Sequence, residues 1–258
     1  MNRLEKLFQQ KSKRILNMYC TAGFPHLNST IEVMRALQHN GADLIELGMP
    51  YSDPLADGPV IQESSAKAIA NGMTIQMLFH QLKDFRKEID VPVILMGYMN
   101  PVLQYGFEKF CADAAACGID GLILPDLPEY EYEKFYAPIL NQYGLSFTFL
   151  VTPETSEARI RKFDALSSGF LYAVSSSATT GSQQNSDGVE AYLKRLQSKQ
   201  LKNPVLVGFG IKDKVSFDRA CTYANGAIIG TAYIQALNQG KSVEETTRSF
   251  IKSVLTTR

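Results

Sequence analysis

Residues 44–59 read Leu44-Ile-Glu-Leu-Gly-Met-Pro-Tyr-Ser-Asp-Pro-Leu-Ala-Asp-Gly-Pro59. They open as an apolar run typical of a buried strand, with one carboxylate, Glu46, inside it. Three prolines then stiffen a loop that carries two more carboxylates, Asp53 and Asp57. Because an ionised group is costly inside a strand, an acid there is usually paired, hydrogen-bonded or used in chemistry. A strand acid beside a rigid acidic loop indicates half of an active site.

Similar apolar runs recur along the chain, with helix-patterned segments between them. Each run is short and rich in Val, Ile, Leu and Tyr, as is typical of parallel strands buried on both faces. Eight such strands alternating with helices in about 250 residues predict a (β/α)₈ TIM barrel. A doubly wound open sheet, which uses fewer strands, is the alternative. The predicted strands are Ile15–Cys20, Leu44–Met49, Val91–Tyr98, Gly121–Pro125, Ser146–Val151, Gly169–Ser175, Val205–Gly210 and Gly226–Gly230.

The chain has no linker-like stretch and no shift in composition, so we expect one domain over residues 1–258. An extra helix, Leu4–Gln10, precedes the first strand and is expected to cover the floor of the barrel. Other helix signals are starts at Asn28-Ser-Thr30 and Pro153-Glu-Thr-Ser-Glu157, and ends at Asn40-Gly41, Asn71-Gly72 and Gly118.

Composition narrows the class of protein. The 26 basic and 26 acidic side chains balance, which argues against a partner that is a nucleic acid or a membrane surface. The apolar runs fall far short of the roughly 20 residues that a membrane helix needs, and the first residues lack an apolar signal core. The four cysteines lack metal-type spacing and are interpreted as reduced thiols. We therefore expect a cytoplasmic protein.

In a barrel of this kind the functional groups lie where strands end. Gly208-Phe-Gly210 and Gly230-Thr231 end the last two predicted strands, and they suit a phosphate because small residues let backbone N–H groups approach it. The alternative is that these glycines only make tight turns.

Glu46, Asp53 and Asp57 allow three interpretations. A divalent-metal site is disfavoured because no His or further carboxylate lies near them in sequence. Asp53 fits a residue that caps a turn. Glu46 and Asp57 are favoured as paired carboxyl groups for acid–base chemistry, with the pKa of Glu46 raised by desolvation and Asp57 ionised in its polar loop. None of the eight strands contains a lysine, which disfavours Schiff-base chemistry.

Glu46-Leu-Gly48 followed by Pro50-x-Ser-Asp-Pro-Leu-Ala-Asp-Gly-Pro59 resembles the signature of the tryptophan synthase alpha subunit family. Four further motifs match that family in order: Tyr98-x-Asn-Pro101, Pro125-Asp-Leu-Pro128, Gly208-Phe-Gly-Ile211 and Gly226–Gly230. The resemblance implies a barrel that cleaves indole-3-glycerol phosphate to indole and glyceraldehyde 3-phosphate without a metal or cofactor. It also implies a partner, a pyridoxal-phosphate beta subunit, in an α₂β₂ tetramer.

By the same resemblance, Glu46 matches the catalytic glutamate and Asp57 the catalytic aspartate. Tyr172 matches a tyrosine of the active site, and Tyr19 matches an aromatic residue that lines the indole pocket. Residues 177–187 correspond to a loop that the family uses as a lid, with Thr180 reaching towards Asp57. The substrate-binding residues implied are Tyr19, Tyr98, Tyr172, Thr180, Gly181, Phe209, Gly210, Gly230 and Thr231.

The chain departs from the family pattern in two places. Ala178 stands where the family's Gly-x-Thr-Gly motif begins, and Thr231 replaces a serine but keeps its hydroxyl. Two other functions remain open at this point: a stand-alone indole-3-glycerol-phosphate lyase, and a non-catalytic regulatory barrel that binds phosphate. Retention of both Glu46 and Asp57 counts against the regulatory barrel.

Overall fold

The computed structural model describes residues 2–174, 186–208, 210–240 and 242–256. In this part of the chain nine parallel strands form one sheet in the order β5-β4-β3-β2-β1-β9-β8-β7-β6. The strands are β1 (Ile15–Thr21), β2 (Leu44–Gly48), β3 (Val93–Met96), β4 (Gly121–Ile123), β5 (Ser146–Phe147), β6 (Leu150–Val151), β7 (Leu171–Val174), β8 (Val205–Gly208) and β9 (Gly226–Ile229).

The two edges of this sheet are consecutive pieces of one extended segment, residues 146–151. On one side Thr148 N donates to Leu122 O at 3.1 Å, continuing the pairing of β5 with β4. On the other side Phe149 O accepts from Tyr172 N at 3.1 Å, continuing the pairing of β6 with β7. The segment therefore closes the sheet, and the predicted (β/α)₈ barrel is confirmed with its fifth strand split in two.

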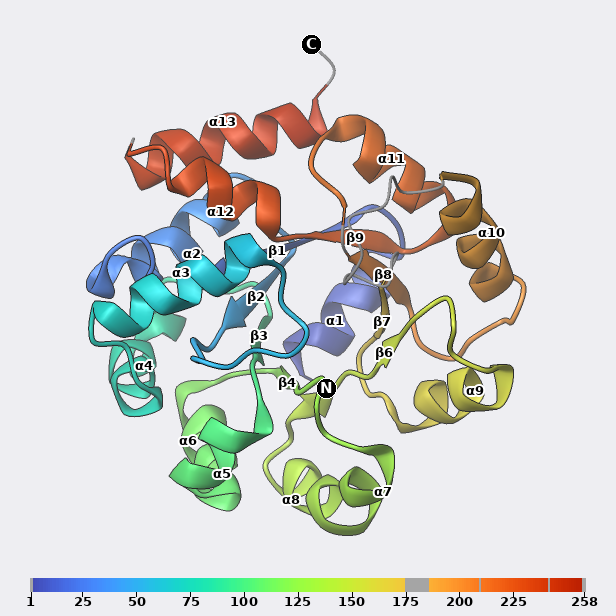
Figure 1. Cartoon of the computed structure of the whole chain (residues 1–258), viewed down its shortest axis with the longest axis horizontal. Coiled ribbons are helices and arrows are strands. Elements are labelled where there is room, and N and C mark those ends of the chain that lie inside the picture. The colour runs from blue at the N-terminus through green and yellow to red at the C-terminus, as the bar shows by residue number, and fades with distance from the viewer. Residues whose placement is uncertain (1, 175–185, 209, 241, 257–258) are drawn as a thin grey trace.

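Helices surround the strands on the outside (Figure 1). Those after the first are α2 (Thr30–His39), α3 (Pro59–Ala70), α4 (Ile75–Leu82), α5 (Met99–Tyr105), α6 (Phe107–Cys117), α7 (Glu129–Glu131), α8 (Ala137–Gln142), α9 (Glu157–Leu166), α10 (Ser186–Gln197), α11 (Lys214–Tyr223), α12 (Thr231–Leu237) and α13 (Val243–Leu255). A π-helical segment, Tyr132–Tyr136, joins α7 to α8, and 3₁₀ turns cover Leu27–Ser29 and Phe85–Lys87. Within the described residues, no helix combines the length and apolar character needed to cross a membrane.

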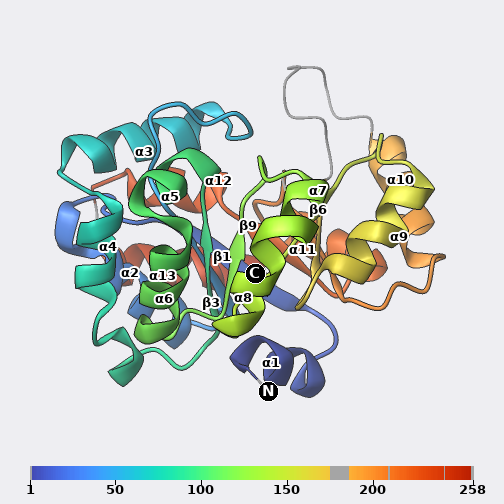
Figure 2. The same cartoon turned by 90° about the horizontal axis from the view of Figure 1, so that it is seen from below.

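The first helix, α1 (Arg3–Gln10), covers one end of the barrel, as expected (Figure 2). Leu4 is fully buried, and Phe8 packs on Phe170 with ring centroids 6.1 Å apart. Asn2 just before the helix donates from Nδ2 to Ser146 Oγ at 2.9 Å. Because Ser146 begins β5 and Phe170 precedes β7, α1 lies at the N-terminal ends of the strands.

Most of the helix signals are confirmed, and one needs correction. Gly41, Gly72 and Gly118 all have positive φ, as helix-ending glycines do. Ser156 caps α9 by accepting from Arg159 N. The cap predicted at residues 28–30 falls at Ser29, but the Ser29 side chain makes no capping hydrogen bond; α2 begins at Thr30, whose hydroxyl accepts from Gly23 N at 3.0 Å. The hydroxyl thus holds the loop after β1.

Candidate active site

Glu46 lies in β2 with 1% of its surface exposed. Its strand pairs with β1 on one side and β3 on the other, with Tyr19 and Ile94 as its register partners. Asn17 Nδ2 donates to Glu46 Oε2 at 3.1 Å. Burial raises the pKa of Glu46 to about 8; the hydrogen bond from Asn17 lowers that pKa, and the charge of Asp57 adds to it. The raised pKa favours the protonated, neutral form of Glu46 at pH 7.

Asp57 lies half-buried in the loop between β2 and α3. Burial raises its pKa, while a hydrogen bond from the Tyr98 hydroxyl lowers that pKa and so favours the carboxylate. The loop is held on both sides of this side chain: Ala56 N donates to Tyr98 Oη at 3.0 Å, and Gln62 Nε2 donates to Asp57 O at 2.8 Å. Asp53, by contrast, is exposed and accepts from its neighbour Ser52.

Two buried tyrosines, Tyr19 on β1 and Tyr172 on β7, lie with Glu46 and Asp57 and form one cluster with them. Burial raises the pKa of both hydroxyls, and the negative charges of Glu46 and Asp57 raise each further, so both tyrosines lie close to both acids. Two glycines provide the room for them. A Cβ atom at Gly48 would lie 2.1 Å from Tyr19 Oη, and one at Gly208 would lie 2.3 Å from Tyr172 Oη.

Comparison with known proteins gives a consistent result. The family model described as "Tryptophan synthase alpha chain" matches residues 5–256. The chain is 48% identical over 255 residues to the tryptophan synthase alpha chain of Parabacteroides distasonis, covering 98% of this chain and 99% of that one. It is 51% identical over 243 residues to that of Flavobacterium johnsoniae, covering 94% and 96%. The chain belongs to the tryptophan synthase alpha chain family.

Solved structures of tryptophan synthase alpha chains share the fold. The alpha subunit from Legionella pneumophila superposes with a TM-score of 0.88 at 35% identity, covering 98% of this chain and 97% of that one. A chain of tryptophan synthase from M. tuberculosis, in its aminoacrylate-bound form, gives a TM-score of 0.86 at 29% identity and covers 98% of both chains.

The predicted phosphate site of this alpha chain is described only in part. Gly230 follows β9 and precedes α12, and a Cβ atom there would lie 3.3 Å from Tyr19 Cβ, so this end of the barrel lies beside the tyrosine. Thr231 begins α12 and is exposed, and Gly210 has a φ of +75°. Phe209, Thr180, Gly181 and nearly all of the predicted lid at 177–187 lie outside the described residues.

Three residues of the cluster were given no role in it by sequence reasoning: Asn17, Gly48 and Gly208. For Asn17 a signal did exist, because it lies two residues before Tyr19 in a strand and so shares a face with it. For the glycines, the need for space appears only once the tyrosines are placed. Among the described residues, no three His, Cys, Asp or Glu side chains are grouped as a metal site would require.

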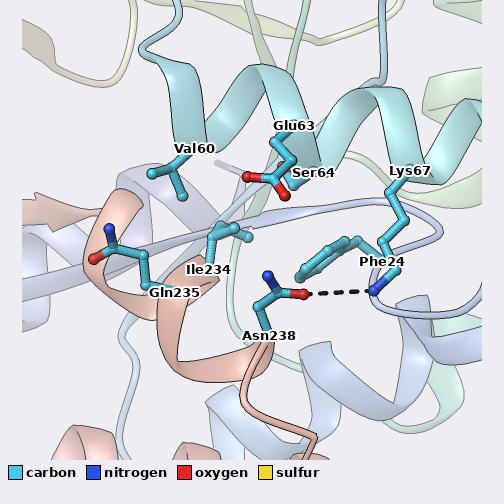
Figure 3. A pocket seen from close by; sticks show the side chains of 8 residues that line it. All are labelled: Phe24, Val60, Glu63, Ser64, Lys67, Ile234, Gln235 and Asn238. Carbon is cyan, nitrogen blue, oxygen red and sulfur yellow. Dashed lines mark hydrogen bonds between the residues drawn. The ribbon is translucent and has the colours of Figure 1, made fainter.

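A separate cleft of about 170 Å³ opens between α3 and α12 (Figure 3). Across it, Lys67 Nζ lies 3.5 Å from Asn238 Oδ1 and 5.1 Å from the centre of the Phe24 ring. Neither Glu46 nor Asp57 lines it; its residues are Phe24, Val60, Glu63, Ser64, Lys67, Ile234, Gln235 and Asn238. Lys67 and Asn238 are exposed, so this is a cleft of the outer surface, distinct from the carboxyl pair.

Proposed function

We propose that Glu46 and Asp57 perform the chemistry of the tryptophan synthase alpha chain in this protein. That reaction is the retro-aldol cleavage of indole-3-glycerol phosphate to indole and glyceraldehyde 3-phosphate, a step of tryptophan biosynthesis. The chain works with a beta subunit in an α₂β₂ complex, which we place in the cytoplasm. The proposed mechanism uses carboxyl groups alone, without a metal or cofactor.

Glu46 begins the reaction as an acid. Its carboxyl group gives a proton to C3 of the indole ring, which makes the ring an indolenine cation. The carboxylate so formed then takes the proton of the hydroxyl on the carbon attached to C3. As that hydroxyl becomes an aldehyde, the carbon–carbon bond breaks and its electrons return to the ring. Glu46 ends protonated, ready for another cycle, and no net proton is consumed.

Asp57 supports the charged intermediate. The indolenine cation carries its positive charge largely at the ring nitrogen, and a carboxylate that accepts the N–H stabilises it. The hydrogen bond from Tyr98 and the contact with Gln62 hold the Asp57 segment in place before substrate arrives. Such a preorganised charge lowers the barrier because little reorganisation is needed during the reaction.

Substrate binding is assigned to two groups of residues at the same end of the barrel. Tyr19, Tyr98 and Tyr172 surround the indole in this proposal, because Tyr19 and Tyr172 lie near both acids and the Tyr98 hydroxyl bonds to Asp57. The phosphate is assigned to the ends of the last strands and to the loop after β7. Its proposed ligands are Gly181, Phe209, Gly210, Gly230 and Thr231, whereas Thr180 of the same loop is proposed to reach towards Asp57.

The observation that carries the proposal is a buried acid with a pKa of about 8 beside a second carboxyl group. The test is steady-state cleavage of indole-3-glycerol phosphate. Glu46→Gln keeps the shape of the side chain but cannot exchange the proton, so kcat should fall by about 10²–10⁴. Asp57→Asn should cost a similar factor through loss of charge.

Asp84→Asn is the matched control, because Asp84 is an exposed acid just before the Phe85–Lys87 turn, outside the Asp57 loop, and its ion pair with Lys87 lies on the surface. It should keep wild-type turnover. A Glu46→Gln enzyme that retained a tenth of the wild-type rate would remove Glu46 from its role as proton shuttle.

A further inference from the structure

We propose that Asn17 is a positioning residue for Glu46: its amide holds Oε2 and thereby directs the acidic proton to Oε1, the oxygen left for substrate. The inference rests on the proposed function, since it needs Glu46 to be the acid. Asn17 is not among the residues proposed above to contact the substrate.

The geometry places Asn17 beneath Glu46. In the register of β1 with β2, Tyr19 is level with Glu46, whereas Asn17 is level with Leu44. Asn17 therefore lies nearer to the floor of the barrel, and its Nδ2 reaches up to Glu46 Oε2 at 3.1 Å. Oε1, the other oxygen of the carboxyl group, is the one that Asn17 does not hold.

A second observation concerns the other half of the same amide. Asn17 is fully buried, and its Oδ1 has no hydrogen-bond partner within the described part of the chain. A buried oxygen without a partner costs about 1–3 kcal/mol, so this asparagine is a poor choice for stability alone. The hydrogen bond that Asn17 Nδ2 donates to Glu46 explains why an asparagine occupies this position.

The chemistry follows from what each atom can do. The Asn17 amide nitrogen only donates, and the better acceptor of a neutral carboxyl group is its C=O oxygen. Oε2 is therefore the C=O oxygen, and the proton resides on Oε1. When Glu46 gives this proton away, the amide remains bonded to the carboxylate, and the bond strengthens because its acceptor is now charged. Asn17 thus favours release of the proton as well as its direction.

The other groups around Glu46 do not favour release of its proton. Asp57 from the β2–α3 loop raises the pKa of Glu46, and burial raises it more. Tyr19 from β1 and Tyr172 from β7 also lie near Glu46, and its charge raises the pKa of both and that of Cys20 on the other face of β1. Among the described residues, Asn17 is the one group that lowers this pKa, so its loss should make Glu46 a weaker acid.

The test uses two variants, Asn17→Val and Asn17→Ala. Valine fills more space than asparagine and alanine fills less, so the two variants share only the loss of the amide. Both should show a kcat about tenfold lower with KM unchanged, because the acid is misplaced while the substrate contacts remain. In both, the loss of kcat/KM at high pH should move to higher pH than in the wild type, where Glu46 loses its proton near pH 8.

The matched control is Thr246→Val on α13. It also removes a buried oxygen without a partner in the described chain, but on an outer helix away from Glu46. It should leave kcat and the pH profile unchanged. A second readout needs no turnover: the infrared C=O stretch of protonated Glu46, identified as the band that Glu46→Gln removes, should move to higher frequency in both Asn17 variants.

Two results would overturn the inference. One is an unchanged pH profile and infrared band in both Asn17 variants. The other is a move of the profile to lower pH, which would mean that Asn17 accepts the Glu46 proton rather than donating to the carboxyl group. Failure of the proposed function is a separate result, because Glu46→Gln would then remain active or the wild-type protein would not cleave indole-3-glycerol phosphate.

Discussion

Glu46 combines two properties at the scale of a single residue: it is enclosed by apolar strand residues, and it is within the influence of a second acid. Enclosure disfavours its charged form by removing water, and Asp57 disfavours it further. The result is an acid that holds its proton at neutral pH yet can release it to a carbon that needs it. A carboxyl group with its ordinary pKa would have lost that proton before substrate bound.

This raised pKa predicts a pH dependence of stability. The unfolded chain loses the Glu46 proton near the ordinary value of 4.5, whereas the folded chain keeps it until about pH 8. Between these values the folded state binds one more proton. The free energy of unfolding, relative to that of Glu46→Gln, should therefore fall as pH rises, by about 1.4 kcal/mol per pH unit. The contribution of Glu46 is fully present below pH 4.5 and is lost by about pH 8.

Urea denaturation of both proteins at steps between pH 5 and pH 8 measures this difference. The other acids, Asp57 among them, are present in both proteins, so their contributions largely cancel. Parallel pH dependences for wild type and Glu46→Gln would contradict the raised pKa.

The sequence predicted that the pKa of Glu46 is raised, because an apolar run on both sides of an acid implies desolvation. It did not reveal the role of Asn17. A side-chain hydrogen bond between neighbouring strands depends on their register, and the register cannot be read from the sequence of either strand alone. The roles assigned to Glu46 and Asp57 stay predictions until their variants are measured.

At the scale of the elements, the site depends on pairs of one large and one small residue on neighbouring strands. Tyr19 of β1 fits over Gly48 of β2, and Tyr172 of β7 fits over Gly208 of β8. Each glycine lets a phenol enter the barrel interior beside the acids. A side chain of any size at these positions would displace the ring.

Gly48→Ala tests this packing. Its new Cβ atom would lie 2.1 Å from Tyr19 Oη and 2.5 Å from Tyr19 Cζ, so the ring must move. We expect a loss of stability of about 1–3 kcal/mol and a lower kcat. Tyr19→Phe removes the closest contact, so the double variant should lose less stability than the sum of the two single changes. Denaturation midpoints of the four proteins measure this coupling; simple additivity would show that Gly48 and Tyr19 do not share a constraint.

The strands were predicted well in their centres and less well at their ends. Apolar runs identify the residues that the barrel buries, but residues such as Tyr98 and Pro125 belong to the loops that follow. The break of the fifth strand was not predicted either. Residues 146–151 read as one apolar strand, and the interruption at Thr148 and Phe149 arises where the segment passes from pairing with β4 to pairing with β7.

At the scale of the whole molecule, closure of the barrel creates the site. Because all strands are parallel, their C-terminal ends meet at one rim, and residues far apart in sequence such as Glu46 and Tyr172 come together there. The opposite end of the barrel, its floor, is covered by α1. The helix that buries the core there and the residues proposed for the chemistry therefore lie at opposite ends. The strand count favoured this arrangement over a doubly wound sheet, since eight βα units match a closed barrel.

The loop that carries Asp57 also predicts how the beta subunit acts. Asp57 is half-buried, and Ser52, Asp53 and Leu55 of the same loop are exposed, so the loop is accessible to a partner. A partner that favours the conformation with Asp57 at the indole N–H will raise the population of competent enzyme.

We therefore expect low turnover of indole-3-glycerol phosphate by the isolated chain and a large increase on titration with beta subunit, saturating at one beta subunit per alpha chain. Glu46→Gln should stay inactive throughout the titration, which shows that the added activity arises in the alpha chain. Full turnover by the isolated chain would contradict this prediction and would favour the stand-alone lyase, because an enzyme that releases indole by itself has no need of a partner to hold Asp57 in place.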